Sequence, residues 1–202
     1  MSDDDPAGDG FVFSPSGMIL KKPPLAPSTD DNVIQPFQLE SSFLRGRIVK
    51  LGGVLDDILK PHAYPETVAH MVAENLTLSL LLSAMLKFDG IFTLQCQGDG
   101  PVKMLAADIT TSGAARACAS FDEERMAKAV ATLQELDSPE GSQNHLAQYL
   151  GKGYVAFTVD PASPDLERYQ GIVELRGASL VDCVQHYFTQ SEQIATGIKM
   201  AV

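Results

Sequence analysis

Basic residues and aromatic residues are both scarce in this 202-residue chain. Tryptophan is absent, and all aromatic residues together make up only 7% of the sequence. Only 15 Lys and Arg stand against 26 Asp and Glu, which gives a formal net charge of −11. A surface this acidic repels phosphate groups, and few aromatic rings are available to stack on bases. We therefore expect no nucleic-acid partner and no binding to anionic membranes.

Long hydrophobic runs are also missing. The most apolar stretch, Leu76–Leu86, is 11 residues long and is interrupted by Thr77, Ser79 and Ser83. A membrane-spanning helix needs about 20 apolar residues. The N-terminus begins Met-Ser-Asp-Asp-Asp, without the basic start and apolar run of a secretory signal. The sequence thus predicts a cytoplasmic protein with no membrane segment.

Cysteine is rare, and the positions of the three cysteines are uninformative as a motif. Cys96, Cys118 and Cys183 are widely spaced and odd in number, which matches neither a disulfide framework nor a C-x-x-C metal site. We predict that all three are small buried side chains in a reducing compartment. The four histidines are scattered, and no nucleophile stands beside an obvious base. Hence we expect no metal ligands and no catalytic residues.

Composition divides the chain into three parts. Residues 1–31 are rich in Asp, Ser, Gly and Pro and carry six acids against two lysines, which predicts a mostly disordered tail. Within this tail, the apolar residues 11–13 and 18–20 are the exception, because they can dock elsewhere as short extended pieces. Residues 32–177 have the pattern of a folded domain, and 178–202 begin with a helical segment. The chain stops in Ile198–Val202, which is mostly apolar and resembles the start of a strand, so we expect the sequence to be truncated there.

The folded part alternates predicted strands and helices. The Gly98–Pro101 turn joins two alternating runs and predicts a β-hairpin. The helix expected over 65–87 is apolar nearly all round in its second half, which places it at the centre of the fold, although the alternation at 76–80 also suits a strand. The expected strands cover 33–39, 47–51, 91–97, 102–109, 116–120, 153–159 and 169–175, and the expected helices 54–60, 65–87, 121–136 and 179–193. The resulting fold class is α+β: antiparallel or mixed sheets packed around a central apolar helix, with a helical C-terminal segment.

The last predicted helix carries the clearest amphipathic stripe. Ser179 suits an N-cap, and Asp182 follows three residues later, as in a capping box. Four apolar side chains then fall on one helical face: Leu180, Val184, Tyr187 and Phe188. Such a stripe is either ordinary core or a contact surface for another molecule.

Several segments together resemble one protein family. Phe37–Glu40 and Arg45–Leu51 are similar to its opening strands, and Leu94–Pro101 resembles its Q-x-Q-G-D-G-P signature. Gly151–Thr158 resembles its G-x-G-Y strand, and Tyr169–Leu180 followed by Tyr187–Gln193 gives the strongest match. The segments occur in the right order from residue 33 onward. On this basis the chain is identified as a member of the redox-regulated chaperones of the heat-shock protein 33 family.

The resemblance implies an ATP-independent holdase that binds unfolded or oxidatively damaged proteins and acts as a dimer. It also implies a switch, in which four C-terminal cysteines in C-x-C and C-x-x-C motifs hold zinc until oxidation forms two disulfides. This chain contains neither motif. The resemblance therefore covers the core domain and the first linker helix but not the sensor. We expect unfolded clients and a second copy of the chain as partners, and no cofactor.

Three functional hypotheses follow. In the first, the chain is a chaperone that contacts clients, or a second copy, through Leu180, Val184, Tyr187 and Phe188, with the net charge keeping complexes in solution. In the second, it is a structural dimerisation domain with no affinity for clients. In the third, it is a small-ligand module with a polar pocket near Gly98–Pro101.

Overall fold

The structure is a computed structural model that describes residues 31–40, 44–135 and 146–201. The tail predicted over 1–31 therefore lies outside the described residues, apart from Asp31. The strands are β1 (Val33–Leu39), β2 (Leu44–Lys50), β3 (Gly90–Gly98), β4 (Val102–Thr110), β5 (Ala115–Phe121), β6 (Gly153–Pro161) and β7 (Tyr169–Glu174). The helices are α1 (Gly53–Leu59), α2 (Glu66–Ser83), α3 (Glu123–Glu135) and α4 (Leu180–Gln190), with short helical turns η2 (Lys60–His62) and η4 (Leu146–Leu150).

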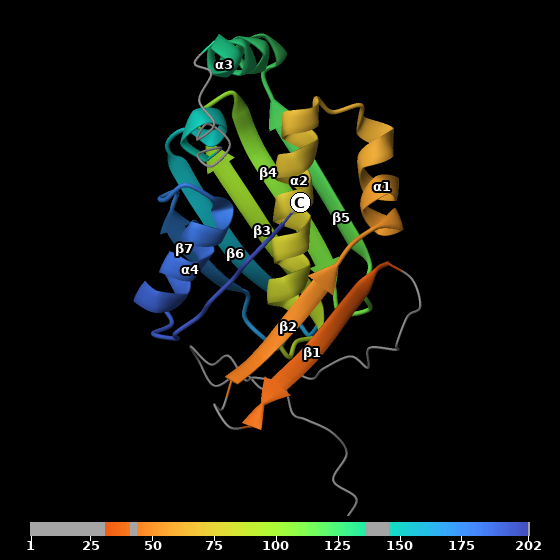
Figure 1. Cartoon of the computed structure of the whole chain (residues 1–202). Helices are drawn as coiled ribbons and strands as arrows, with labels where there is room; N and C mark the ends of the chain where they lie inside the picture. Colours follow the sequence, from red (N-terminus) through yellow and green to blue (C-terminus); the bar gives the residue numbers. More distant parts are fainter. Residues whose placement is uncertain (1–30, 41–43, 136–145, 202) are drawn as a thin grey trace, which may run out of the picture.

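The centre of the molecule is a five-stranded antiparallel sheet in the order β5-β4-β3-β6-β7. The predicted hairpin forms its middle, with β3 and β4 joined through residues 99–101. Alternate side chains of β3, including Leu94 and Cys96, are fully buried on one face. Helices α1, α2 and α4 all lie on that same face, as Figure 1 shows. The predicted α+β class with a central apolar helix is confirmed.

Helix α2 runs through the core. Residues 76–80, whose alternation also suited a strand, are therefore helical. The buried polar side chains of α2 are satisfied locally: the Ser79 hydroxyl donates to the Asn75 carbonyl at 2.6 Å, and the Asn75 amide donates to the Leu94 carbonyl at 3.3 Å. The helix ends at Ser83 rather than at the expected Lys87. Beyond Ser83 the backbone tightens into bonds between residues three apart, such as Leu86 N–H to the Ser83 carbonyl.

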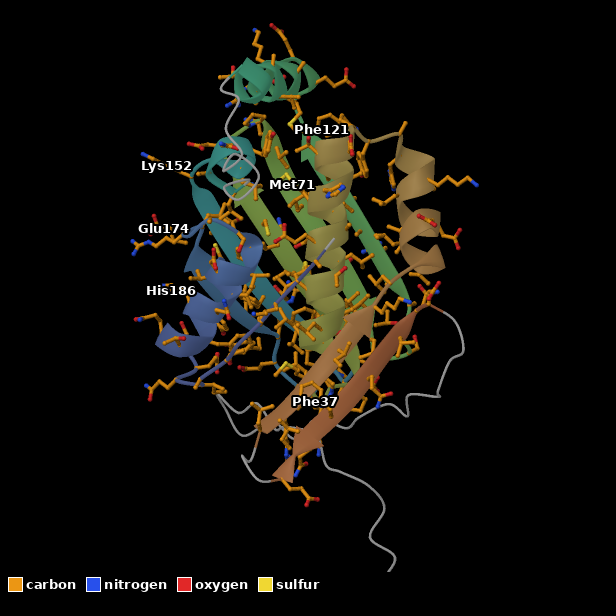
Figure 2. The ribbon with its side chains drawn as sticks, viewed as in Figure 1. Phe37, Met71, Phe121, Lys152, Glu174 and His186 are labelled. Atoms are coloured by element: carbon orange, nitrogen blue, oxygen red, sulfur yellow. The ribbon has the colours of Figure 1, made fainter. Side chains whose placement is uncertain are left out.

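Strands β1 and β2 form a separate two-stranded ribbon beside the lower end of α2 (Figure 1). Ile34 and Val49 point toward the core, whereas Phe37 and Ile48 belong to the exposed face. Strand β2 begins three residues earlier than the sequence predicts. Figure 2 contrasts the two environments, with Met71 of α2 inside the molecule and Phe37 out on the ribbon.

Two regions differ from the sequence-based expectation. The turn η4 was not predicted, and it buries Leu146, Tyr149 and Leu150. The strand expected at the C-terminus is not formed over residues 198–201, so that prediction is wrong. Instead residues 193–201 cross over α2 as an extended strap (Figure 1), and the Ile198 N–H donates to the Gln185 side chain at 2.8 Å. The alternating sequence has a strand's pattern, but no strand among the described residues pairs with it.

Candidate functional site

The four apolar residues proposed for contact come together beneath α4 and are buried within this chain. Leu180 and Val184 are fully covered, and Tyr187 and Phe188 nearly so. The Tyr187 ring stacks on Phe157 of β6, with a centroid distance of 4.4 Å. Gly171 of β7 permits this packing, because a Cβ there would lie 2.4 Å from the Tyr187 hydroxyl. These residues can therefore reach another molecule only when α4 leaves the sheet.

The N-terminal end of α4 is built as the sequence predicts. The Ser179 hydroxyl accepts from the Asp182 N–H at 3.2 Å, and the Asp182 carboxylate accepts from the Ser179 N–H at 3.0 Å, which completes a capping box. Burial raises the pKa of the Glu74 carboxyl on the neighbouring α2, and a hydrogen bond from the Leu180 backbone opposes that shift. Local sequence thus fixes where α4 begins.

The opposite face of the five-stranded sheet is bare of helices within the described part of the chain. Its side chains are short or uncharged along the central strands, including Thr93 and Gln95 of β3. Three larger apolar side chains interrupt this surface: Ile91 is 40% exposed, Tyr154 37% and Ile172 59%. We call this surface the open face. It is the one extended flat surface of the sheet that the described helices leave uncovered.

The open face is electrically balanced, although the protein is strongly acidic. Each of three acids on or beside it forms an ion pair with an arginine, which leaves no net charge from these groups. The pairs are Asp108 with Arg116 at 2.5 Å, Glu174 with Arg176 at 2.7 Å, and Asp160 with Arg168. These paired groups contrast with the net charge of −11 of the whole molecule. Another acidic protein can approach this face with less repulsion than elsewhere.

Sequence reasoning did not single out the open face. The alternation of Ile91–Gln97 does show that Thr93, Gln95 and Gln97 share one side of β3. It does not show whether a helix covers that side, because the cover depends on elements distant in the chain. The ion pair between Asp108 of β4 and Arg116 of β5 depends in the same way on strand register.

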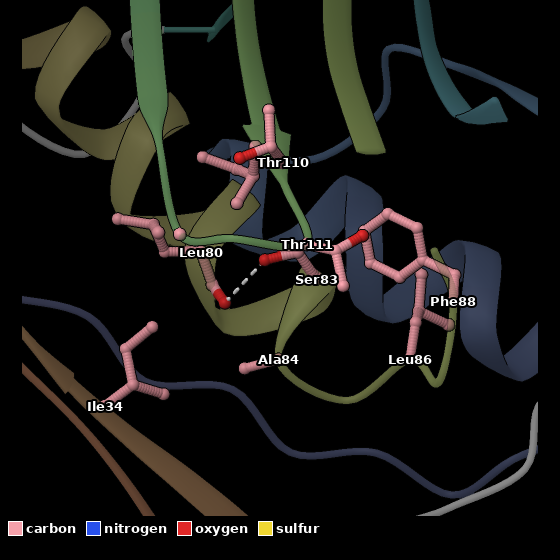
Figure 3. Close-up of a pocket in the computed structure, with 10 residues that line it drawn as sticks. Ile34, Leu80, Ser83, Ala84, Leu86, Phe88, Thr110 and Thr111 are labelled. Carbon is pink, nitrogen blue, oxygen red and sulfur yellow. Dashed lines mark hydrogen bonds between the residues drawn. The ribbon is translucent and has the colours of Figure 1, made fainter. Parts of the chain in front are cut away.

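A cavity of about 100 Å³ lies at the C-terminal end of α2, beside the ribbon β1–β2. Figure 3 shows its largely apolar lining, which includes Ile34, Leu86 and Phe88. The Ser83 hydroxyl at its wall is already bonded to the Leu80 carbonyl at 3.1 Å. This cavity does not match the polar pocket expected near Gly98–Pro101 under the small-ligand hypothesis.

The backbone N–H groups of the Gly98–Pro101 turn are hydrogen-bonded to another part of this chain. The Gly100 N–H donates to the Leu150 carbonyl at 2.8 Å, and the Asp99 N–H donates to the Lys152 carbonyl at 2.9 Å. The Asp99 carboxylate in turn accepts from the Lys152 N–H at 2.8 Å. Because these donors are used internally, the turn joins two loops and does not form a cradle for phosphate.

The cysteines do not form the zinc site of the family. Cys96 and Cys183 are buried, but Cys118 is exposed on β5, so the prediction that all three are buried is wrong for Cys118. The Cys183 thiol donates to the Arg176 carbonyl at 2.8 Å, and burial raises its pKa to about 11. No group of three His, Cys, Asp or Glu residues suited to a metal occurs among the described residues. In the same part of the chain, no helix is both long and apolar enough to cross a bilayer.

The fold defines an α+β domain built on a five-stranded antiparallel sheet, and comparison with known proteins gives its family. The family model described as Hsp33 protein matches residues 32–202. The 33 kDa chaperonin of Caulobacter vibrioides strain NA1000 is 39% identical over 180 residues, covering 88% of this chain and 57% of the relative. That of Proteus mirabilis is 35% identical over 167 residues, covering 83% of this chain and 51% of the relative.

A solved structure agrees with this assignment at the level of the fold. The crystal structure of the 33 kDa chaperonin from Thermotoga maritima superimposes with a TM-score of 0.66 at 19% identity, covering 81% of this chain and 52% of that one. The chain therefore belongs to the Hsp33 family, as the sequence motifs predicted. It spans about half the length of the curated relatives it matches.

Proposed function

We propose that this chain is a holdase chaperone domain that binds unfolded or oxidatively damaged proteins without ATP and prevents their aggregation. The names of its relatives, 33 kDa chaperonins, support a chaperone role. Holding a client requires contact area and no reactive constellation, and we propose no catalytic step. The proposed setting is the cytoplasm, and three free cysteines are consistent with a reducing compartment.

The exposed apolar side chains of the open face are the main support for this proposal. Ile91, Tyr154 and Ile172 provide exposed apolar contacts on a surface that also carries uncharged side chains such as Thr93 and Gln95. Unfolded clients expose apolar segments, and apolar surface on both partners favours their association. The acidic remainder of the chain then keeps the complex in solution through self-repulsion.

The stripe beneath α4 is the second part of the proposal. Leu180, Val184, Tyr187 and Phe188 provide a hidden apolar surface that becomes available if α4 detaches, together with the sheet area that α4 covers. Redox activation through a zinc switch needs the C-x-C and C-x-x-C cysteines, which this chain does not contain. We propose that the open face gives these 202 residues a holding activity of their own.

A homodimer is part of the proposal, and the ribbon β1–β2 favours it as a contact region. Four large apolar side chains lie exposed on one face of the ribbon: Phe37, Leu39, Leu44 and Ile48. The other face of the ribbon packs on the core through Ile34 and Val49, so a second copy would meet the face that carries these four side chains. A purely structural dimerisation domain differs from the holdase in one respect, since it would sediment as a dimer yet leave client aggregation unchanged.

A charge placed on the open face tests the client site. In Ile172→Asp, we expect about tenfold more chain to be needed for half-maximal suppression of light scattering by a heat-denatured client, because an exposed apolar anchor becomes a repelling carboxylate. Val54→Asp is the matched control, since Val54 is also a partly exposed apolar residue, 37% accessible, but lies on α1. Equal activity of the two variants would remove the open face from the proposal.

A further inference from the structure

Three polar side chains meet where the C-terminal end of α4 lies over the sheet. The hydroxyl groups of Tyr169 on β7 and Tyr187 on α4 are 2.5 Å apart. Both hydroxyls also contact the Glu192 carboxylate just beyond the helix, Tyr187 donating at 2.6 Å and Tyr169 at 3.0 Å. The three residues therefore connect a strand, the helix and the start of the strap.

The surroundings favour strong hydrogen bonds at this point. Burial raises the pKa of both phenols, that of Tyr187 more strongly. Each phenol has one proton, so the two protons serve two of the three short contacts at a time, and at least one of them is donated to the Glu192 carboxylate. Bonds from a neutral donor to a carboxylate are about twice as strong as bonds between neutral groups. The Tyr187 ring below is fixed by stacking on Phe157. Packing thus holds the hydroxyl in the position where the carboxylate can accept its bond.

The strap is attached to the same end of the helix. The Ile194 N–H donates to the Phe188 carbonyl at 3.0 Å, two residues beyond Glu192. The strap then runs over α2, where Ile198 and Met200 pack against the core. Opening the contacts of Glu192 would therefore loosen both the last turn of α4 and the start of the strap.

We propose that Tyr169, Tyr187 and Glu192 form a latch that determines how often α4 leaves the sheet and uncovers the apolar stripe. The inference rests on the proposed function for its purpose, because α4 matters only if the stripe contacts another molecule. The opening of α4 is a property of this chain alone, and its rate can be measured with no client present. Tyr169 and Glu192 are positioning residues in this account.

The test compares amide hydrogen exchange of α4 with that of α2 in the intact chain. In Tyr169→Phe and in Glu192→Gln, we expect α4 amides to exchange about tenfold faster, while α2 amides stay unchanged. The first change removes one of the two donors of the cluster, and the second removes the charge of its acceptor. Alkylation of Cys183, a buried residue of α4, should accelerate in parallel in a Cys118→Ser background. The ratio to α2 separates local opening from a loss of overall stability.

Tyr154→Phe is the matched control. It also removes a phenol bond, from the Tyr154 hydroxyl to the Gln97 side chain at 2.5 Å, but on the open face. We expect it to leave α4 exchange at the wild-type rate. The latch is wrong if Tyr169→Phe and Tyr154→Phe give the same α4 exchange, or if α2 accelerates as much as α4. A chain that fails to hold clients but shows the selective change in α4 would contradict only the proposed function.

Discussion

Val184→Asp is expected to detach α4 from the sheet and to increase the amount of client that the chain holds. Val184 has no exposed surface, and an unpaired charge buried among apolar side chains costs about 3–5 kcal/mol. That cost is relieved if the helix moves into solvent while the sheet and α2 stay folded. The expected signs are increased fluorescence of an apolar dye and stronger suppression of client light scattering per mole of chain.

His186→Asp is the control for this variant. It places the same charge on the same helix, but His186 is exposed at the outer edge of the molecule (Figure 2). We expect neither readout to change. If Val184→Asp abolishes protection of the α2 amides as well, α4 unfolds only with the entire domain, and the stripe cannot serve as a hidden client surface.

The contact between the Gly98–Pro101 turn and β6 is expected to be the least tolerant part of the backbone. A Cβ at Gly153 would lie 1.8 Å from the Gln97 carbonyl oxygen, and one at Gly100 would lie 2.3 Å from the Tyr149 carbonyl oxygen. The Gln97 carbonyl cannot move without disturbing the pairing of β3 with β6. We expect Gly153→Ala to lower the free energy of unfolding by about 3 kcal/mol, measured by urea denaturation.

Gly197→Ala provides the comparison for that measurement. A Cβ at Gly197 meets nothing within 4 Å, and its backbone has no left-handed conformation. Alanine there should be neutral or should stabilise the chain slightly, because it restricts the unfolded state. If both variants had the same small effect, the close approach of the two loops would not contribute to stability.

Much of the fold is encoded locally and could be predicted from the sequence. Strict alternation located β3 and β4, and the Ser179–Asp182 spacing located the start of α4. The errors occur where structure depends on distant partners. The strap has the alternation of a strand, yet in the described part of the chain no strand pairs with it. The turn η4 is fixed by its packing against the turn at Gly98–Pro101.

The candidate site was less predictable, for the same reason. The sequence identified the α4 stripe, but whether it faces the sheet or solvent is a property of the tertiary structure. Cys118 was predicted wrongly from the general tendency of cysteine to be buried. A better signal was available, because Cys118 alternates with Ala117 and Ala119 and so shares one side of β5 with Arg116 and Ser120. That side belongs to the open face.

The most direct test of the account is light scattering of a heat-denatured client with this 202-residue chain, once under thiol reductant and once after peroxide. We predict equal suppression under both conditions, because the open face is uncovered in either state and the chain lacks the cysteine motifs of the family's switch. No suppression under either condition would contradict the holdase assignment for this chain. Suppression only after peroxide would also contradict the account, since it would require a switch among Cys96, Cys118 and Cys183.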